Sequence, residues 1–199
     1  MELYIFDFDD TLFQTDARVH IIDPATSEIV RSLTTYDYSK FEDEVDFYKL
    51  NGYIFDYSET ANPKTLKDAI PISKYILYLK LLKKRNKDIA ILTSRAVHPI
   101  YIQRCIKKQT NIKIPLNNII CVNHELTYKK IKRKILEYNM GFKPSKNRKK
   151  IGLQYFIKKG YKKICYYDDD INNIRVAEYI NYESKCLDYN IKIYSHLVE

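Results

Sequence analysis

Short apolar runs alternate along the chain with stretches that have the periodicity of amphipathic helices. The apolar runs have the length of buried strands, and they lie at Leu3–Phe8, Asp88–Leu92, Asn118–Val122, Lys163–Tyr167 and about 190–194. Helical patterns occupy residues 72–85, 99–109, 127–138, 149–159 and 171–182. This alternation predicts an α/β fold, a Rossmann-like three-layer sandwich with a mainly parallel sheet and helices on both faces.

The segment at residues 14–70 does not follow the alternation. It contains turn-forming pairs such as Asn51-Gly52 and short β-like runs at His20–Ile22 and Glu28–Leu33. We therefore expect an insertion after the first strand of a single 199-residue domain. The insertion is predicted to form a small cap or flap, a β-hairpin plus a loop that covers the site.

Charge is distributed unevenly along the chain, whose net charge is +9. Residues 1–60 carry 14 acidic and 4 basic side chains, whereas residues 129–163 carry 14 basic side chains and Glu137 as their one acid. This asymmetry indicates an anionic partner, and nucleic acid bound through the basic segment 129–163 is one candidate. A solvated, lysine-rich surface is the alternative.

Aromatic residues interleave the basic segment, as stacking platforms for bases would. They are Tyr128, Tyr138, Phe142 and Tyr155. The alternative is that Tyr155 packs in the core and that the others are ordinary surface aromatics. On the other side, acidic residues of the insertion are expected to repel long nucleic acid, and they are Glu42, Asp43, Glu44 and Asp46.

The four cysteines lie at positions 105, 121, 165 and 186, and no two of them form a CxxC pair. This pattern favours a reduced, cytoplasmic protein over a disulfide framework. The first ten residues lack the basic and long apolar regions of a signal peptide. Nor does any window approach the 18 apolar residues that a membrane span requires.

Carboxylates gather where two of the predicted strands end. Asp7, Asp9 and Asp10 lie at the end of the first strand, and residues 168–170 form a second run of aspartates after the strand at Lys163–Tyr167. Crowded carboxylates repel one another unless a cation or a proton compensates. Two acidic strand ends therefore predict a site for an oxygen-ligated divalent metal, with Mg²⁺ favoured. For the first run alone, an Asp-rich turn is the alternative.

Two weaker signals accompany the acidic clusters. Thr93 and Ser94 end the second strand, where a hydroxyl can donate to an anionic oxygen or can cap a helix. A cluster of lysines lies before and at the start of the helix at 149–159, and a lysine there can reach a phosphate. Neither signal is specific by itself.

In this order, DFDDTLF, ILTSR, a lysine and YYDDDINNI resemble the four motifs of the haloacid dehalogenase superfamily of phosphohydrolases. The resemblance covers residues 3 to about 180. It excludes dehalogenase chemistry, because that branch lacks the second aspartate of the first motif. The segments DPATSEIV, LTTYDYSKF and YIFDYSE are similar to small phosphatases of that superfamily encoded by phages and large DNA viruses.

The resemblance implies roles for residues of the first two motifs. Asp7 matches the nucleophile, which forms an aspartyl-phosphate, and it also ligates the metal. Asp9 matches the general acid and base, and its backbone carbonyl ligates the metal. Thr11 matches a residue that orients the loop beside the phosphate. Thr93 matches the hydroxyl that bonds a phosphoryl oxygen, and Ser94 and Arg95 are grouped with it on the substrate side.

The third motif is a lysine at the start of the helix before the fourth strand. Lys149 lies 19 residues before Asp168, which is close to the usual spacing. Lys146 and Lys150 are rivals that spacing does not exclude.

In the fourth motif, the resemblance implies that Asp169 is the principal metal ligand. Asp168 is either a supporting residue or an alternate ligand. Asn173 stands where many members of the superfamily carry an aspartate, so it ligates or orients a water and the site has one negative charge fewer.

The sequence thus predicts a Mg²⁺-dependent phosphohydrolase whose substrate is a nucleotide or a nucleic-acid terminal phosphate. Three alternatives remain open. One is a phosphatase of a small non-nucleotide phosphomonoester. Another is a nucleic-acid-binding protein that keeps the fold but has lost catalysis. The last is a receiver-like domain phosphorylated as a signal, which fits the DxDxT spacing poorly.

Overall fold

A computed structural model describes residues 1–136, 147–187 and 190–198. Three side chains singled out in the sequence lie outside these stretches, namely Tyr138, Phe142 and Lys146. The side chains of Glu42 and Asp43 are likewise not described.

Five strands form a central sheet in which every neighbouring pair is parallel, in the order β10-β9-β1-β7-β8. The strands are β1 (Glu2–Phe6), β7 (Asp88–Thr93), β8 (Ile119–Cys121), β9 (Lys163–Asp168) and β10 (Lys192–Leu197). The predicted parallel sheet is therefore confirmed, and each strand lies within two or three residues of its predicted position. Phe6 aligns with both Tyr167 and Ile91, so β1, β9 and β7 end at one edge.

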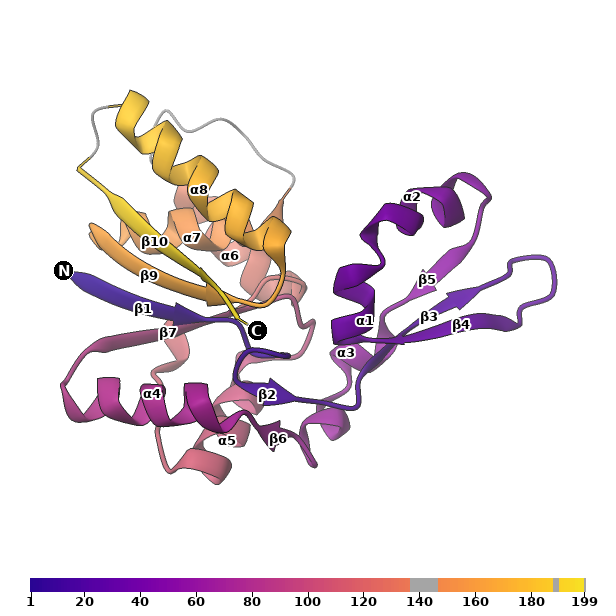
Figure 1. Cartoon of the computed structure of the whole chain (residues 1–199), viewed down its shortest axis with the longest axis horizontal. Coiled ribbons are helices and arrows are strands. Elements are labelled where there is room, and N and C mark those ends of the chain that lie inside the picture. Colours follow the sequence, from indigo (N-terminus) through magenta and orange to yellow (C-terminus); the bar gives the residue numbers. More distant parts are fainter. Residues whose placement is uncertain (137–146, 188–189, 199) are drawn as a thin grey trace.

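Helices cover both faces of the sheet (Figure 1). On one face lie α4 (Ser73–Lys84) and α5 (Pro99–Thr110), and on the other lie α6 (Glu125–Leu136), α7 (Arg148–Lys158) and α8 (Ile171–Cys186). Strand β1 alternates between the two cores: Phe6 packs with Leu79 of α4, whereas Leu3 packs with Phe156 of α7. This arrangement is compatible with the expected Rossmann-like sandwich. A short 3-10 helix, η2 (Leu116–Asn118), precedes β8.

The segment after β1 forms a separate small layer. Its strands are β2 (Phe13–Gln14), β3 (Arg18–Ile22), β4 (Ile29–Thr34), β5 (Ile54–Asp56) and β6 (Ile70–Pro71). Its helices are α1 (Thr35–Lys40), α2 (Glu42–Leu50), α3 (Ser58–Ala61) and the 3-10 helix η1 (Pro63–Leu66). The expected hairpin is present as β3 and β4, but β5 extends it to a three-stranded antiparallel sheet.

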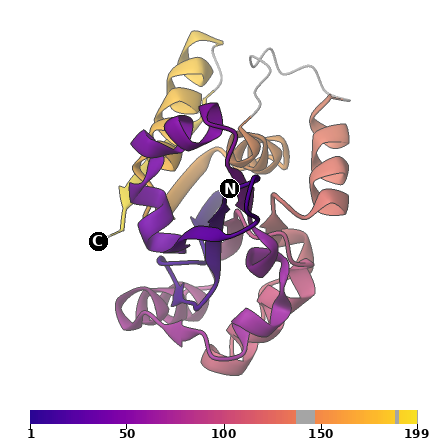
Figure 2. The same ribbon diagram turned by 90° about the vertical axis from the view of Figure 1, so that its right-hand side faces the viewer.

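This inserted layer has its own apolar cluster and a closed base. Ile21, Leu33, Phe41 and Val45 are buried together within it. At its base, β2 pairs with β6, so the two ends of the insertion leave and rejoin the domain side by side. The two views show the insertion beyond the carboxyl edge of the central sheet (Figures 1 and 2). It is therefore positioned next to any site that forms on that edge.

Two helices begin with side-chain caps that fix the residues near this edge. The Asn147 side chain accepts a hydrogen bond from the backbone N–H of Lys150 at the start of α7, and Asp170 does the same for Asn172 at the start of α8. Gly160 follows α7 with φ +92°, as expected for a glycine that ends a helix.

All four cysteines are free thiols, and Cys186 alone among them is exposed. Among the residues that the structure describes, no helix is both long enough and apolar enough to cross a membrane.

Candidate active site

A pocket of about 360 Å³ opens at the carboxyl edge of β1, β7 and β9. Its walls bring together residues of all four sequence motifs, among them Asp7, Thr93, Lys149 and Asp169. The insertion contributes Tyr38 and Thr60, among others, from the opposite side. In open α/β sheets, ligands bind outside the carboxyl ends of the strands, where the strand order reverses, and here it reverses at β1.

Three buried carboxylates form the centre of the pocket. Asp7, Asp168 and Asp169 each offer an oxygen, and these oxygens all lie within 4.8 Å of one another. Asp7 follows β1 directly, and its backbone N–H donates to Tyr167 O of β9. That bond continues the β1–β9 register, so the first acidic run lies beside the second.

Lys149 is the lysine that reaches this cluster. Its Nζ lies 2.7 Å from Asp168 Oδ2 and 3.1 Å from Asp7 Oδ1. Lys150, the neighbouring candidate, points instead to Glu183 of α8, with 2.8 Å between Lys150 Nζ and Glu183 Oε2. Burial lowers the pKa of Lys149, but the Asp168 and Asp7 carboxylates raise it by more, so this ammonium stays charged.

Asp168 is held on every side by donors from the protein. It accepts hydrogen bonds from Lys149 Nζ, the Tyr166 hydroxyl, the backbone N–H of Asp170 and Asn173 Nδ2. Four donors fill the lone-pair positions of a carboxylate. Asp168 therefore fixes Lys149 and the start of α8, and Asp7 and Asp169 retain more free oxygen capacity.

The carboxylates outnumber the positive charge that faces them. Among the described residues, these three carboxylates face one ammonium group, that of Lys149, which leaves two negative charges in a buried cluster. Burial raises the pKa of Asp7 well above its ordinary value, and the Asp168 and Asp169 carboxylates add to this against the opposing effect of Lys149. Burial and the Asp168 charge raise the pKa of Asp169 to about 7.

The donor set fits a divalent cation. Asp7 Oδ1 is buried and accepts no hydrogen bond, although Lys149 lies at ion-pair distance. Asp169 accepts one hydrogen bond, from Thr11 Oγ1 at 3.2 Å. Hard carboxylate oxygens are the ligands that Mg²⁺ prefers, and a charge of +2 matches the excess of the cluster.

Asp9 is not part of this cluster, although its side chain lines the same pocket. The Arg95 guanidinium clamps it: Nε donates to Asp9 Oδ2 and Nη2 donates to Asp9 Oδ1, both at 2.8 Å. Arg95 also donates to the hydroxyls of Thr15 and Thr65 in the insertion. The side chain of Arg95 is 1% exposed, so the clamp is an interior, bidentate ion pair.

The remaining predicted residues occupy different parts of the site. Thr93 is buried, and its Oγ1 accepts a hydrogen bond from the Arg95 backbone N–H. Ser94 is exposed on the pocket wall, and its carbonyl accepts from Asn123 Nδ2. Asn173 donates to Asp168 and Asp170, so its amide orients carboxylates in this structure.

The insertion is tied to the loop of the first motif. Asp10 adopts a left-handed conformation, φ +56°, in the tight turn after Asp9, and aspartate tolerates this better than most residues. Its Oδ2 accepts a 2.6 Å hydrogen bond from Thr35 Oγ1 at the start of α1. Burial raises the pKa of Asp10, and the Thr35 bond opposes this effect.

Two participants were not identified from the sequence. One was Tyr166, whose hydroxyl donates to Asp168. The sequence carried a signal for this contact, because residues two apart on a strand face the same side and Tyr166 lies two residues before Asp168 on β9. The other was the pairing of Arg95 with Asp9, across 86 residues of sequence, for which no local pattern exists.

Comparisons with known proteins identify no relative of this chain. No protein-family model, no curated protein and no solved structure matches this chain. A function therefore has to be inferred from the site itself.

Proposed function

We propose that this protein is a Mg²⁺-dependent phosphohydrolase that forms a phosphorylated intermediate on Asp7. The observation that carries the proposal is the buried cluster of Asp7, Asp168 and Asp169 with Lys149 against it. A carboxylate surrounded by carboxylates cannot approach a phosphate dianion without cations nearby. Lys149 supplies one positive charge, and the free oxygens of Asp7 and Asp169 would hold Mg²⁺.

In the first half of the reaction, an oxygen of Asp7 attacks phosphorus and the bond to the leaving oxygen breaks. The leaving oxygen takes a proton from Asp9, which acts as the general acid once it has taken up a proton and released one of the N–H groups of Arg95, because both of its oxygens accept from Arg95 in this structure. In the second half, Asp9 removes a proton from a water that attacks the phosphorus, and the bond between phosphorus and Asp7 breaks. One water is consumed, and an alcohol and inorganic phosphate are released.

Three further residues support these steps. Arg95 holds Asp9 in one orientation through two hydrogen bonds, so it is a positioning residue. Lys149 and the Thr93 hydroxyl at the same pocket are suited to the phosphoryl oxygens, where developing charge needs preorganised donors. When bound, Mg²⁺ would neutralise phosphate charge as a Lewis acid.

The inserted layer is proposed to act as a cap that selects the substrate. Tyr38, Tyr57 and Thr60 of the insertion line the pocket opposite the carboxylates. The Tyr38 and Tyr57 hydroxyls lie 2.7 Å apart, which makes a polar, aromatic wall. Such a wall suits the leaving group of a phosphomonoester, and a nucleotide or a nucleic-acid end fits the overall charge of +9.

The test is Mg²⁺-dependent release of phosphate from a generic aryl phosphate, followed by a panel of mononucleotides and of 3′- or 5′-phosphorylated oligonucleotides. Wild type is compared with Asp7→Asn, which keeps the size of the side chain but removes the nucleophile. Loss of turnover in the variant with an unchanged unfolding temperature is expected. Equal activity in the two proteins, or activity indifferent to EDTA, would refute the proposal.

A further inference from the structure

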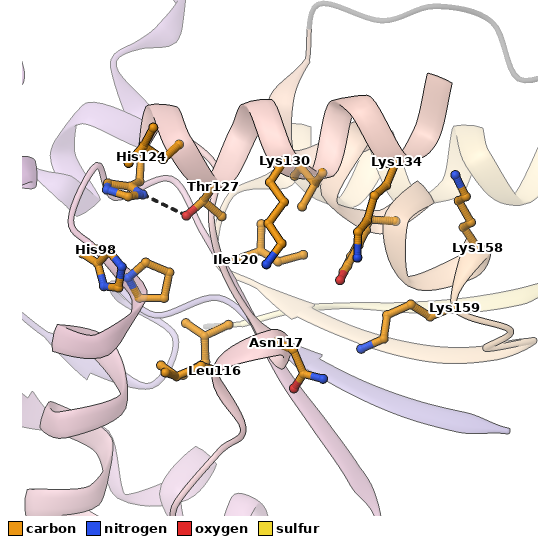
Figure 3. Close-up of a pocket in the computed structure, with 15 residues that line it drawn as sticks. His98, Leu116, Asn117, Ile120, His124, Thr127, Lys130, Lys134, Lys158 and Lys159 are labelled. Carbon is orange, nitrogen blue, oxygen red and sulfur yellow. Dashed lines mark hydrogen bonds between the residues drawn. The ribbon is translucent and has the colours of Figure 1, made fainter. Parts of the chain in front are cut away.

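A second and larger cavity, of about 850 Å³, lies outside the catalytic pocket. It is enclosed by the start of α5, by η2 and β8, and by one face each of α6 and α7. Figure 3 shows Lys130 and Lys134 extending from α6 toward this cavity. His98 and His124 lie at one end of it, and the other two lysines of the lining lie toward the opposite end.

The charged side chains of the lining are cationic. The lining contains the side chains of Lys130, Lys134, Lys158 and Lys159, together with two histidines, and no carboxylate among the described residues. Lys130 and Lys134 are four residues apart on α6, so they lie on the same face about 6 Å apart along the helix. The positive charges are thus spread along the cavity and do not converge on one point.

The floor of the cavity is apolar. Ile119, Ile120 and Ile131 line it from β8 and α6, with the ring of Tyr155 beneath the lysines. Lys134 and Lys159 Nζ lie 5.9 and 5.7 Å from the centre of that ring. Tyr155 is otherwise buried, which confirms the core alternative for this residue. An apolar floor below a row of ammonium groups suits a ligand that is both flat-faced and multiply anionic.

Residues that are neighbours in the sequence line the cavity at one end and the catalytic pocket. The histidine end of the cavity is formed by His98 and His124, whose rings are 5.2 Å apart in an edge-to-face contact. The residue before His124 is Asn123, which lines the catalytic pocket and donates to Ser94 O at 2.6 Å. The histidine end is therefore the end of the cavity whose lining is next in sequence to the lining of the catalytic pocket.

We propose that this cavity binds single-stranded nucleic acid, with successive phosphates along Lys130, Lys134 and Lys159 and the bases toward the apolar floor. A chain with one phosphate per unit matches cations that are spread out, whereas a single phosphate needs them gathered. Binding of a strand in the cavity does not depend on whether the protein is an enzyme. That the strand leads its terminal phosphate toward Asp7 rests on the proposed function.

The ionisation of the lining groups is consistent with an anionic occupant. Burial lowers the pKa of Lys159, and the Lys134 charge lowers it further against the opposing effect of Asp88. Burial and the nearby His98 likewise lower the pKa of His124. An anion beside Lys134 and Lys159 would offset the repulsion between these two ammonium groups.

The test is fluorescence anisotropy with a labelled oligothymidylate of about 12 nucleotides that carries no terminal phosphate. Lys130→Gln/Lys134→Gln removes two charges from the cavity. Lys129→Gln/Lys132→Gln removes two charges from exposed positions of the same helix that do not line it. The cavity variant is expected to bind roughly 10-fold more weakly, with a slope of log Kd against log salt reduced by about 1.4, while the control changes little.

Three results would overturn the proposal: no binding by wild type at low salt, equal weakening in the two variants, or equally effective displacement by a mononucleotide or by polyglutamate. Aryl phosphate turnover of both variants is measured in parallel and is expected to match wild type. Strand binding that depends on the cavity, without any turnover in wild type, would uphold this inference and refute the proposed phosphohydrolase. Turnover of aryl phosphate by wild type without cavity-dependent strand binding would refute this inference and uphold the proposed phosphohydrolase.

Discussion

Asp169→Asn is expected to stabilise the metal-free protein and to abolish its stabilisation by Mg²⁺. Asp169 is one of three buried carboxylates that face a single ammonium group, and it is 8% exposed. Asparagine keeps the size of the side chain and an oxygen that can still accept the hydrogen bond from Thr11 Oγ1. The substitution therefore removes one buried charge with little change in packing.

The magnitude follows from the pKa of Asp169, which burial and Asp168 raise from an ordinary 3.8 to about 7. A difference of about 3 pKa units means that ionising this carboxyl in the folded state costs up to roughly 4 kcal/mol above neutral pH. Removing that cost is expected to raise the unfolding temperature, by roughly 2–4 °C for each kcal/mol in a chain of this size.

The sign of the pH dependence is fixed by the direction of the shift. Because the folded-state pKa of Asp169 lies above its unfolded value, the metal-free wild type loses stability as pH rises from about 4 through about 7. The difference in unfolding free energy between Asp169→Asn and metal-free wild type is therefore largest at about pH 8. It falls by roughly half or more at about pH 5.

The assay is thermal unfolding in EDTA and in excess Mg²⁺ at both pH values. Wild type is expected to gain about 3 kcal/mol at a hundredfold excess of Mg²⁺ over its Kd, and Asp169→Asn is expected to gain nothing. Asp170→Asn is the matched control, because residue 170 caps α8 outside the cluster and asparagine caps equally well. The reasoning would be refuted if Asp169→Asn and wild type had the same unfolding temperature in EDTA at the higher pH. It would also be refuted if Mg²⁺ still raised the unfolding temperature of Asp169→Asn.

Three further predictions concern the cations around the site. Lys149→Met is expected to reduce turnover roughly 100-fold or more, because it removes the charge that faces the phosphoryl oxygens. Lys150→Met is expected to keep turnover per folded molecule but to cost roughly 3–5 kcal/mol in urea unfolding, because buried Glu183 loses its partner; the opposite pattern would make Lys150 the catalytic lysine. Arg95→Lys is expected to lower kcat roughly 10–100-fold at nearly constant KM, because an ammonium cannot reproduce the two bonds that orient Asp9; an increase in KM alone would indicate direct contact with phosphate.

The sequence by itself determined the central sheet and the edge where the acidic residues meet. Apolar runs that end in carboxylates identify both the strands and their carboxyl ends. In a parallel sheet those ends share one edge, so Asp7 and Asp169 had to lie near each other once β1 and β9 were neighbours. The physical reason is that strand length, strand polarity and side-chain alternation are local properties of the chain.

Spacing along the sequence did not decide between Lys149 and Lys150 as the lysine of the third motif. In the structure, the rotation of α7 about its axis decides between them. Consecutive residues on a helix point about 100° apart, so Lys149 faces the carboxylates while Lys150 faces Glu183 of α8. Helical periodicity predicts that the two lysines point in different directions. Which of them faces the carboxylates depends on the rotation of α7 about its axis, and packing fixes that rotation. Gly152 is one determinant, because a Cβ at that position would overlap Leu92 of β7.

Only the tertiary structure decided what surrounds Asp9 and what the basic segment forms. The Arg95 clamp joins residues 86 positions apart, and the insertion became a three-stranded layer where the sequence predicted a hairpin and a loop. The cationic cavity likewise combines α5, η2, α6 and α7, whereas the sequence indicated only that its lysines belong to the basic segment 129–163. Such features arise from contacts between distant segments, whose energies depend on how whole elements pack and leave no periodic signal in the chain.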